Sequence, residues 1–158
     1  MRTTRSVEIS RTADEVYAFL ADVRHEVAWR SSIVGSRFVG TTVPAVGVRG
    51  ETDVEMGSRA LTMRWVVTVA DADARTVAWT LDGDPWDGGG SYAVREHTGG
   101  CVVTASLEVR LHGVARVLEP VVGAAFRRGL RADLARLVAV LEAPPADLGS
   151  DGAVADRS

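Results

Sequence analysis

The chain has 158 residues, of which 46% are hydrophobic and 25% are charged, and its formal net charge is −3. This size and balance are typical of one water-soluble domain that buries its own core, and they exclude a disordered chain. No apolar stretch reaches membrane-spanning length, and the first ten residues lack the apolar run of a signal peptide. We therefore expect a cytoplasmic protein without membrane insertion.

The basic residues are all arginines, which favours a GC-rich, actinobacterial source. Their only cluster, Arg127, Arg128 and Arg131, is too small to hold a nucleic-acid backbone, so we expect no nucleic-acid partner. Cys101 is the single cysteine and lies in an alternating apolar run. It is expected to be a buried, inert thiol without a disulfide partner.

The N-terminal third begins with a strand followed by two helices. Residues 2–10 alternate polar and apolar side chains, as a half-buried strand does. Thr12 and Glu15 form a T-x-x-E capping box, which predicts a helix that starts there and ends near Asp22. A second, short helix is expected over residues 24–29.

Six further strands are separated by turns rich in Gly, Asp or Pro, and they are expected over residues 33–40, 46–56, 60–71, 75–82, 89–97 and 101–111. The strand 60–71 should direct Met63, Trp65, Val67 and Val69 to the core and Arg64 and Thr68 to solvent. Strands without intervening helices favour an antiparallel meander with one wet face. Trp86 and the triplet Gly88–Gly90 are assigned to a flexible hairpin loop.

A long amphipathic helix closes the domain. Its regular part is expected to start near Pro120 and to reach Glu142, with one broad apolar face and arginines on the other side. The small, polar, Pro- and Gly-containing residues 143–158 should be a disordered tail. The domain therefore spans residues 1–142.

Four stretches carry a family resemblance: VEISRTADEVYAFLADVRHEVAW, GVRGETDVEM, MRWVVTVADADARTVAWTLDG and FRRGLRADLARLVAVLE. In this order they resemble the START/Bet v 1-like (SRPBCC) superfamily, in its polyketide cyclase/dehydrase and lipid-transport branch. The resemblance implies an α+β helix-grip fold, in which a curved antiparallel sheet of six to seven strands wraps around the long C-terminal helix. It also implies an apolar cavity between the sheet and that helix.

Seven large side chains are candidates for the wall of this cavity: Trp29, Met63, Trp65, Trp79, Trp86, Tyr92 and Phe126. Aromatic rings offer flat apolar surface, and Trp and Tyr add an N–H or O–H group that a ligand can meet. Core packing is the competing interpretation for Trp65 and Trp79, whereas Trp86 is a candidate for the rim.

The sequence predicts neither a metal site nor a cofactor nor a covalent nucleophile. His25, His97 and His112 do not lie at metal-ligand spacings, and no serine lies in a nucleophile elbow. His25 precedes Trp29 on the second short helix and is a candidate acid or base, although a surface role is the simpler interpretation.

The leading hypothesis is the binding of a small hydrophobic or aromatic molecule, such as a polyketide, fatty-acyl or isoprenoid-like compound. The second is a polyketide aromatase/cyclase or dehydratase that uses acid/base catalysis. Such enzymes place an arginine and hydroxyl groups inside the pocket, which Arg64 and Thr68 could supply only if the strand parity were reversed. The third is a co-chaperone-type interaction module that uses the helix arginines. Catalysis, ligand identity and the choice between monomer and homodimer stay open.

Overall fold

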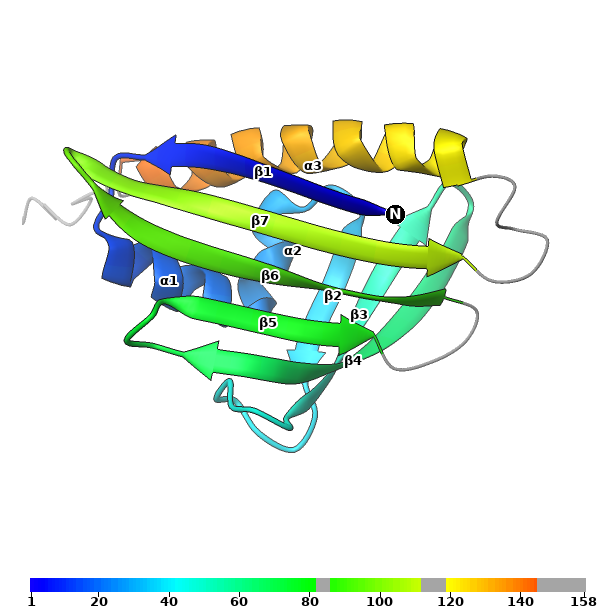
Figure 1. Cartoon of the computed structure of the whole chain (residues 1–158). Helices are drawn as coiled ribbons and strands as arrows, with labels where there is room; N and C mark the ends of the chain where they lie inside the picture. The colour runs from blue at the N-terminus through cyan, green and yellow to red at the C-terminus, as the bar shows by residue number, and fades with distance from the viewer. Residues whose placement is uncertain (82–85, 112–118, 145–158) are drawn as a thin grey trace, which may run out of the picture.

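The computed structural model describes residues 1–81, 86–111 and 119–144 (Figure 1). In chain order the elements are β1 (Arg2–Ile9), α1 (Ala13–Ala21), the 3-10 turn η1 (Val23–His25), α2 (Glu26–Trp29), β2 (Ile33–Phe38), β3 (Arg49–Met56), β4 (Arg59–Asp71), β5 (Thr76–Leu81), β6 (Trp86–His97), β7 (Gly100–Leu111) and α3 (Glu119–Glu142). None of the described helices is long and apolar enough to cross a membrane.

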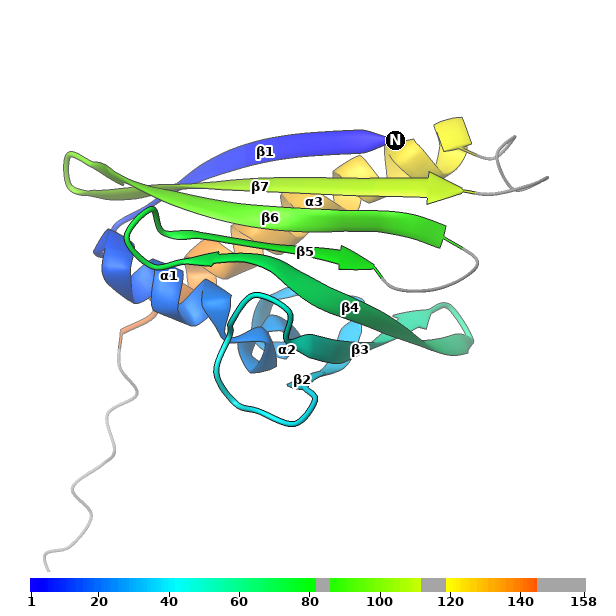
Figure 2. The same cartoon turned by 60° about the horizontal axis from the view of Figure 1, so that its bottom comes forward.

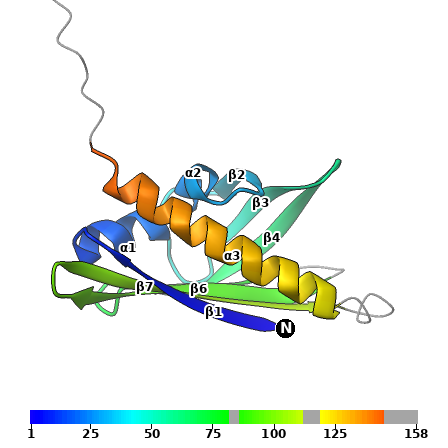
Figure 3. The same ribbon diagram turned by 90° about the horizontal axis from the view of Figure 1, so that it is seen from above.

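The seven strands form one antiparallel sheet in the order β1-β7-β6-β5-β4-β3-β2. The sheet curls into a half-barrel, and α3 runs along its concave side (Figures 2 and 3). α1 packs against β6 and β7, and α2 packs against α3 and β2. This architecture confirms the predicted helix-grip fold.

Local sequence signals explain where the helices begin and end. Thr12 Oγ1 accepts a hydrogen bond from the backbone N–H of Glu15, and the Glu15 carboxylate accepts one from the N–H of Thr12, so the predicted capping box is present. Asp22 ends α1 and caps η1 by accepting from the N–H of Arg24 at 3.1 Å. α3 starts beside Pro120, where a missing N–H costs no intrahelical hydrogen bond.

The glycine triplet is part of β6, so the predicted strand 89–97 was right at Gly89 and Gly90, and the assignment of the triplet to a hairpin loop was wrong. Gly88 to Gly90 all pair with β7, Gly89 and Gly90 also pair with β5, and Trp86 begins the strand. The reason is packing: a Cβ atom at Gly90 would lie 2.6 Å from both Trp79 Cζ2 and Leu107 Cδ2. Glycine is required there because the neighbouring side chains already fill the space above the strand.

The inward face of β4 also ends earlier than predicted. Trp65 and Val67 are buried, but Val69 is 38% exposed. A β-bulge between Val67 and Val69 shifts the register against β5, and a bulge inserts one residue into the alternation. The prediction for Val69 was wrong for that reason.

The main core lies on the concave side, where α1, α2 and α3 meet β1, β5, β6 and β7. Its buried members are Ile9, Ala13, Val16, Leu20, Trp29, Val77, Tyr92, Val94, Cys101, Val103, Ala105, Leu107, Leu130, Leu134 and Leu137. Cys101 is buried as predicted, and burial raises the pKa of its thiol. Most of the predicted tail, residues 145–158, lies outside the described residues.

Candidate functional site

A small cavity of about 40 Å³ lies between the sheet and the end of α1, η1 and α2. Its wall is contributed by Leu20, Ala21, Val23, Glu26, Arg30, Phe38, Pro44, Thr52, Met63, Trp65, Val67, Val77, Trp79, Leu81 and Tyr92. Apolar side chains dominate this wall, and a few polar groups converge on it. That composition is typical of a small-molecule site.

Four of the seven predicted pocket residues line this cavity: Met63, Trp65, Trp79 and Tyr92. Trp29 is buried behind it and contacts the Tyr92 ring edge to face at 5.7 Å between centroids. Phe126 packs against the main core rather than lining the cavity. The side chain of Trp86 lies outside what the structure describes.

The aromatic rings are held tightly against the sheet. Trp79 lies 4.9 Å from Tyr92, and Trp65 meets Phe38 edge to face at 5.8 Å, both between ring centroids. Gly50 makes room for Trp65, because a Cβ atom there would clash with the indole ring. The rings therefore have fixed positions, and the cavity is the space that they leave.

A partly buried chain of hydrogen bonds runs beside the cavity and includes its wall residues Glu26, Thr52 and Trp65. Ser36 Oγ donates to Glu26 Oε2 at 3.1 Å and lies 2.9 Å from Thr52 Oγ1. Thr52 Oγ1 in turn accepts from Trp65 Nε1 at 2.9 Å. This chain links α2 to β2, β3 and β4, and it orients the Trp65 indole.

Arg30 is the cation of the site and lies between two carboxylates. Its Nη1 donates to Glu26 Oε1 at 3.4 Å, and its Nε lies 3.9 Å from Asp133 Oδ2. Burial opposes the charge of Arg30, but the neighbouring Glu26 and Asp133 help to outweigh it, so the pKa of the guanidinium is raised. One arginine and two carboxylates leave this group with one net negative charge.

Asp133 also fastens α3 to the end of α2. Its Oδ1 accepts hydrogen bonds from the backbone N–H of Ser31 at 3.0 Å and from Ser31 Oγ at 2.9 Å. A buried carboxylate needs such partners to offset its lost hydration. The charged group beside the cavity therefore also holds the long helix in place.

Tyr92 Oη lacks a hydrogen-bond partner, and it is the only such buried side-chain oxygen or nitrogen in the described part of the chain. The residue is 2% exposed and lines the cavity. Burial raises the pKa of Tyr92 well above its usual value, and the positive charge of Arg30 offsets only part of this increase. Arg30 carries donors alone, so it cannot accept the phenol proton. The phenol therefore keeps its proton and can donate it in a hydrogen bond.

Three residues of the site were not predicted from the sequence: Glu26, Arg30 and Asp133. A usable signal was present, because Asp133 lies on the apolar stripe of α3 next to Leu134, where a carboxylate is costly without partners. The signal for a buried site was weaker at Glu26 and Arg30, because an i, i+4 pair of opposite charge is usual on a helix surface.

Other candidates lie away from the cavity. His25 stacks on Phe19 at 4.4 Å between ring centroids, and its Nδ1 lies 2.9 Å from the Phe19 carbonyl oxygen. Arg64 is exposed on the outer face of the sheet, where its Nε reaches Glu51. Arg127, Arg128 and Arg131 are exposed on α3, as expected of a solvated helix face. The described residues contain no cluster of three or more His, Cys, Asp or Glu side chains placed to hold a metal ion.

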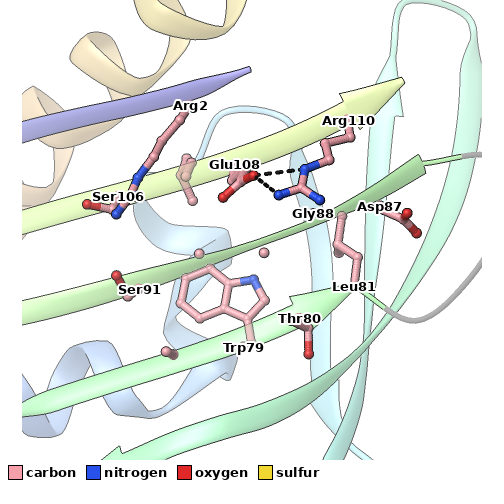
Figure 4. Close-up of a pocket in the computed structure, with 14 residues that line it drawn as sticks. Arg2, Trp79, Thr80, Leu81, Asp87, Gly88, Ser91, Ser106, Glu108 and Arg110 are labelled. Atoms are coloured by element: carbon pink, nitrogen blue, oxygen red, sulfur yellow. Dashed lines mark hydrogen bonds and ion pairs between the residues drawn. The ribbon is translucent and has the colours of Figure 1, made fainter. Parts of the chain in front are cut away.

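A larger hollow of about 550 Å³ lies over β5, β6 and β7 (Figure 4). Its rim carries the outward-facing side chains of Arg2, Glu108 and Arg110, of which Arg110 is paired with Glu108 at 2.7 Å. Trp79 and Leu81 border both this hollow and the inner cavity. The rim is polar, and two of its charged side chains, Glu108 and Arg110, already pair with each other. The inner cavity is therefore the stronger candidate for an apolar ligand.

The model of a family described as "Polyketide cyclase / dehydrase and lipid transport" matches residues 1–142. No curated protein matches the chain in sequence.

Solved structures with the same fold include TTHA0849 from Thermus thermophilus, with a TM-score of 0.76 and 11% identity over 89% of this chain and 97% of that one. The ZhuI aromatase/cyclase from Streptomyces sp. R1128 has a TM-score of 0.72 and 16% identity over 90% and 93%. The di-domain aromatase/cyclase BexL from the BE-7585A biosynthetic pathway has a TM-score of 0.70 and 17% identity over 88% and 45%. At these identities the likeness concerns the fold.

Proposed function

Because the chain belongs to the polyketide cyclase/dehydrase and lipid transport family, we propose that it binds a small hydrophobic or aromatic molecule in the cavity between the sheet and the η1–α2 segment. The observation that carries this proposal is the cavity wall itself. Apolar and aromatic side chains surround the space, while Arg30 and Tyr92 bring polar donors to it. A core built only for stability would have no use for an unpaired phenol.

Ligand entry requires the wall to move, because about 40 Å³ is far below the roughly 300 Å³ of the smallest usual ligand sites. One part of the wall, Pro44, belongs to the connection 39–48 rather than to a strand or helix. Gly40 and Gly47 have positive φ angles of 77° and 86°, a conformation that favours glycine. We place the opening at this connection.

Hydrogen bonds hold the two ends of the connection 39–48, whereas the residues between them belong to no strand. Val39 N–H donates to the Arg49 carbonyl, and Gly47 N–H donates to the Val67 carbonyl. Val43 and Val46, between these anchors, are exposed. Movement of the segment between the anchors would uncover the cavity without breaking the strand ladder.

A titration with 2-ethylnaphthalene tests the proposal, with quenching of tryptophan fluorescence as the readout, since Trp65 and Trp79 line the cavity. Ala21 is buried in the wall, so Ala21→Leu places a larger side chain in the cavity. We expect it to weaken binding about tenfold or more, which corresponds to a typical overpacking cost.

Ala18→Leu is the matched control, because Ala18 is exposed on the same helix and should leave binding unchanged. Equal affinity of both variants and the original chain would contradict binding in this cavity. Native mass spectrometry of protein purified from its host should in addition reveal a retained lipophilic compound.

A second candidate function is an aromatase/cyclase or dehydratase, and the positions of Arg30 and Tyr92 favour it. An arginine and a hydroxyl do line the cavity, although they come from the end of α2 and from β6 instead of β4. Donors aimed at a ketone oxygen stabilise the charge that develops when an enol attacks it. A synthetic poly-β-ketone thioester should then cyclise faster with the protein than without it, and a Tyr92→Phe variant should lose most of that acceleration.

A further inference from the structure

The strongest unexplained feature of the molecule is the polar end of the cavity. Tyr92 Oη is fully buried without a partner, and Arg30 lines the same space. Arg30 has five N–H donors, and its side chain makes a hydrogen bond to Glu26 Oε1 at 3.4 Å. Two side chains with unused donor capacity therefore face one small apolar volume.

From this geometry we infer that the polar end of the cavity selects ligands by charge: it accepts an uncharged oxygen, such as a ketone or ester carbonyl, and discriminates against a carboxylate. Tyr92 and Arg30 are the specificity-determining donors, and Glu26 and Asp133 are the source of the discrimination. The inference rests on the proposed function, since it concerns the ligand of the same cavity.

The preference for an oxygen acceptor follows from the donors. A buried hydroxyl without a partner is costly, and a ligand oxygen that accepts its hydrogen bond removes that cost. A hydrocarbon of the same shape leaves the donor unpaired. The site should therefore distinguish the two ligands through one hydrogen bond, a difference of about five- to tenfold in affinity.

The discrimination against carboxylates follows from the charges. The positive charge of Arg30 is already faced by Glu26 at 3.4 Å and by Asp133 at 3.9 Å, so an additional anion would meet a net negative group. The pKa of Tyr92 supports the same conclusion. Glu26 and Asp133 both act with burial to raise the pKa of Tyr92, so a negative charge on its oxygen is disfavoured in spite of Arg30.

Three naphthalene derivatives of similar shape test the inference: 2-acetylnaphthalene, 2-ethylnaphthalene and 2-naphthoate. With the original chain at neutral pH, the ketone should bind about five- to tenfold more tightly than the hydrocarbon, and the carboxylate should bind more weakly than the ketone by about tenfold or more. In Tyr92→Phe the ketone should lose its advantage, while the affinity for the hydrocarbon stays the same.

Glu26→Gln provides the second arm, because it removes one negative charge and keeps a similar shape. It should raise the affinity for 2-naphthoate and leave that for 2-ethylnaphthalene unchanged. The inference is overturned if the carboxylate binds as tightly as the ketone, or if Tyr92→Phe weakens ketone and hydrocarbon equally. Failure of all three compounds to bind the original chain would instead overturn the proposed function, so the two failures are distinguishable.

Discussion

Tyr92→Phe should make the protein more stable, which is the reverse of the usual effect of removing a buried polar group. In most cores a tyrosine hydroxyl has a partner, and its loss costs about 1 kcal/mol. Here Tyr92 Oη is buried and unpaired. Its burial without a hydrogen bond costs about 1–3 kcal/mol, and phenylalanine avoids this cost while retaining the ring contacts with Trp29 and Trp79.

We expect an increase of about 1 kcal/mol in the free energy of unfolding, since the loss of oxygen contacts offsets part of the gain. For a chain of this size that corresponds to an increase in Tm of about 2–4 °C. Urea unfolding followed by far-UV circular dichroism measures the difference as a shift of the midpoint at constant m-value.

Tyr17→Phe is the natural control, because Tyr17 is only partly buried and is the other tyrosine of the chain. It should change the unfolding free energy by no more than about 0.5 kcal/mol. If Tyr92→Phe lowered the stability by about 1 kcal/mol, the hydroxyl would have a partner in solution, and the reasoning about the polar end of the cavity would be refuted.

Three further changes test the packing and the charges. Above pH 10.0, the ordinary pKa of tyrosine, the unfolded chain loses the Tyr92 proton while the native chain keeps it. The free energy of unfolding should therefore fall as the pH rises. The urea midpoints of Tyr92→Phe at about pH 9 and pH 11 should differ less than those of the original chain. Gly50→Ala should lower the free energy of unfolding by about 1–3 kcal/mol and shift the tryptophan emission, because the added methyl group clashes with Trp65. Gly129→Ala is the control, since Gly129 has open space in a helix, and it should raise the free energy of unfolding by about 0.5–1 kcal/mol. Urea unfolding measures both changes. Asp133→Ala removes two hydrogen bonds and a buried counter-charge, so it should lower the free energy of unfolding in urea by about 3 kcal/mol. A decrease below about 0.5 kcal/mol, as at an exposed aspartate, would contradict the structural role of Asp133.

The sequence was sufficient for the order of the elements because each has a local signal. The capping box at Thr12 and Glu15 marks the first helix, and strict alternation marks the strands. Local signals failed where tertiary packing decided the outcome. Gly88–Gly90 has the composition of a loop, yet these residues pair as a strand, and at Gly90 the side chains of Trp79 and Leu107 leave no room for a Cβ atom.

The apolar half of the candidate site was predictable and the charged half was not. Met63 and Trp65 share the inward face of β4, which alternation reveals. Glu26 lies on a helix of one turn and Arg30 directly follows it, so periodicity cannot distinguish the buried side from the exposed side. The size of the cavity depends on gaps of a few ångströms between side chains, and a pattern of residue types does not contain that information.

The position of Pro44 has a consequence for redesign of the protein. Strand and helix residues in the cavity wall also pack in the sheet or the main core, whereas Pro44 lies in a surface connection whose ends are anchored to Arg49 and Val67. Surface connections tolerate substitution and insertion far better than packed elements do. Grafting connections of different length between these two anchors is therefore the most direct route to variants that admit larger or smaller guests on an unchanged scaffold.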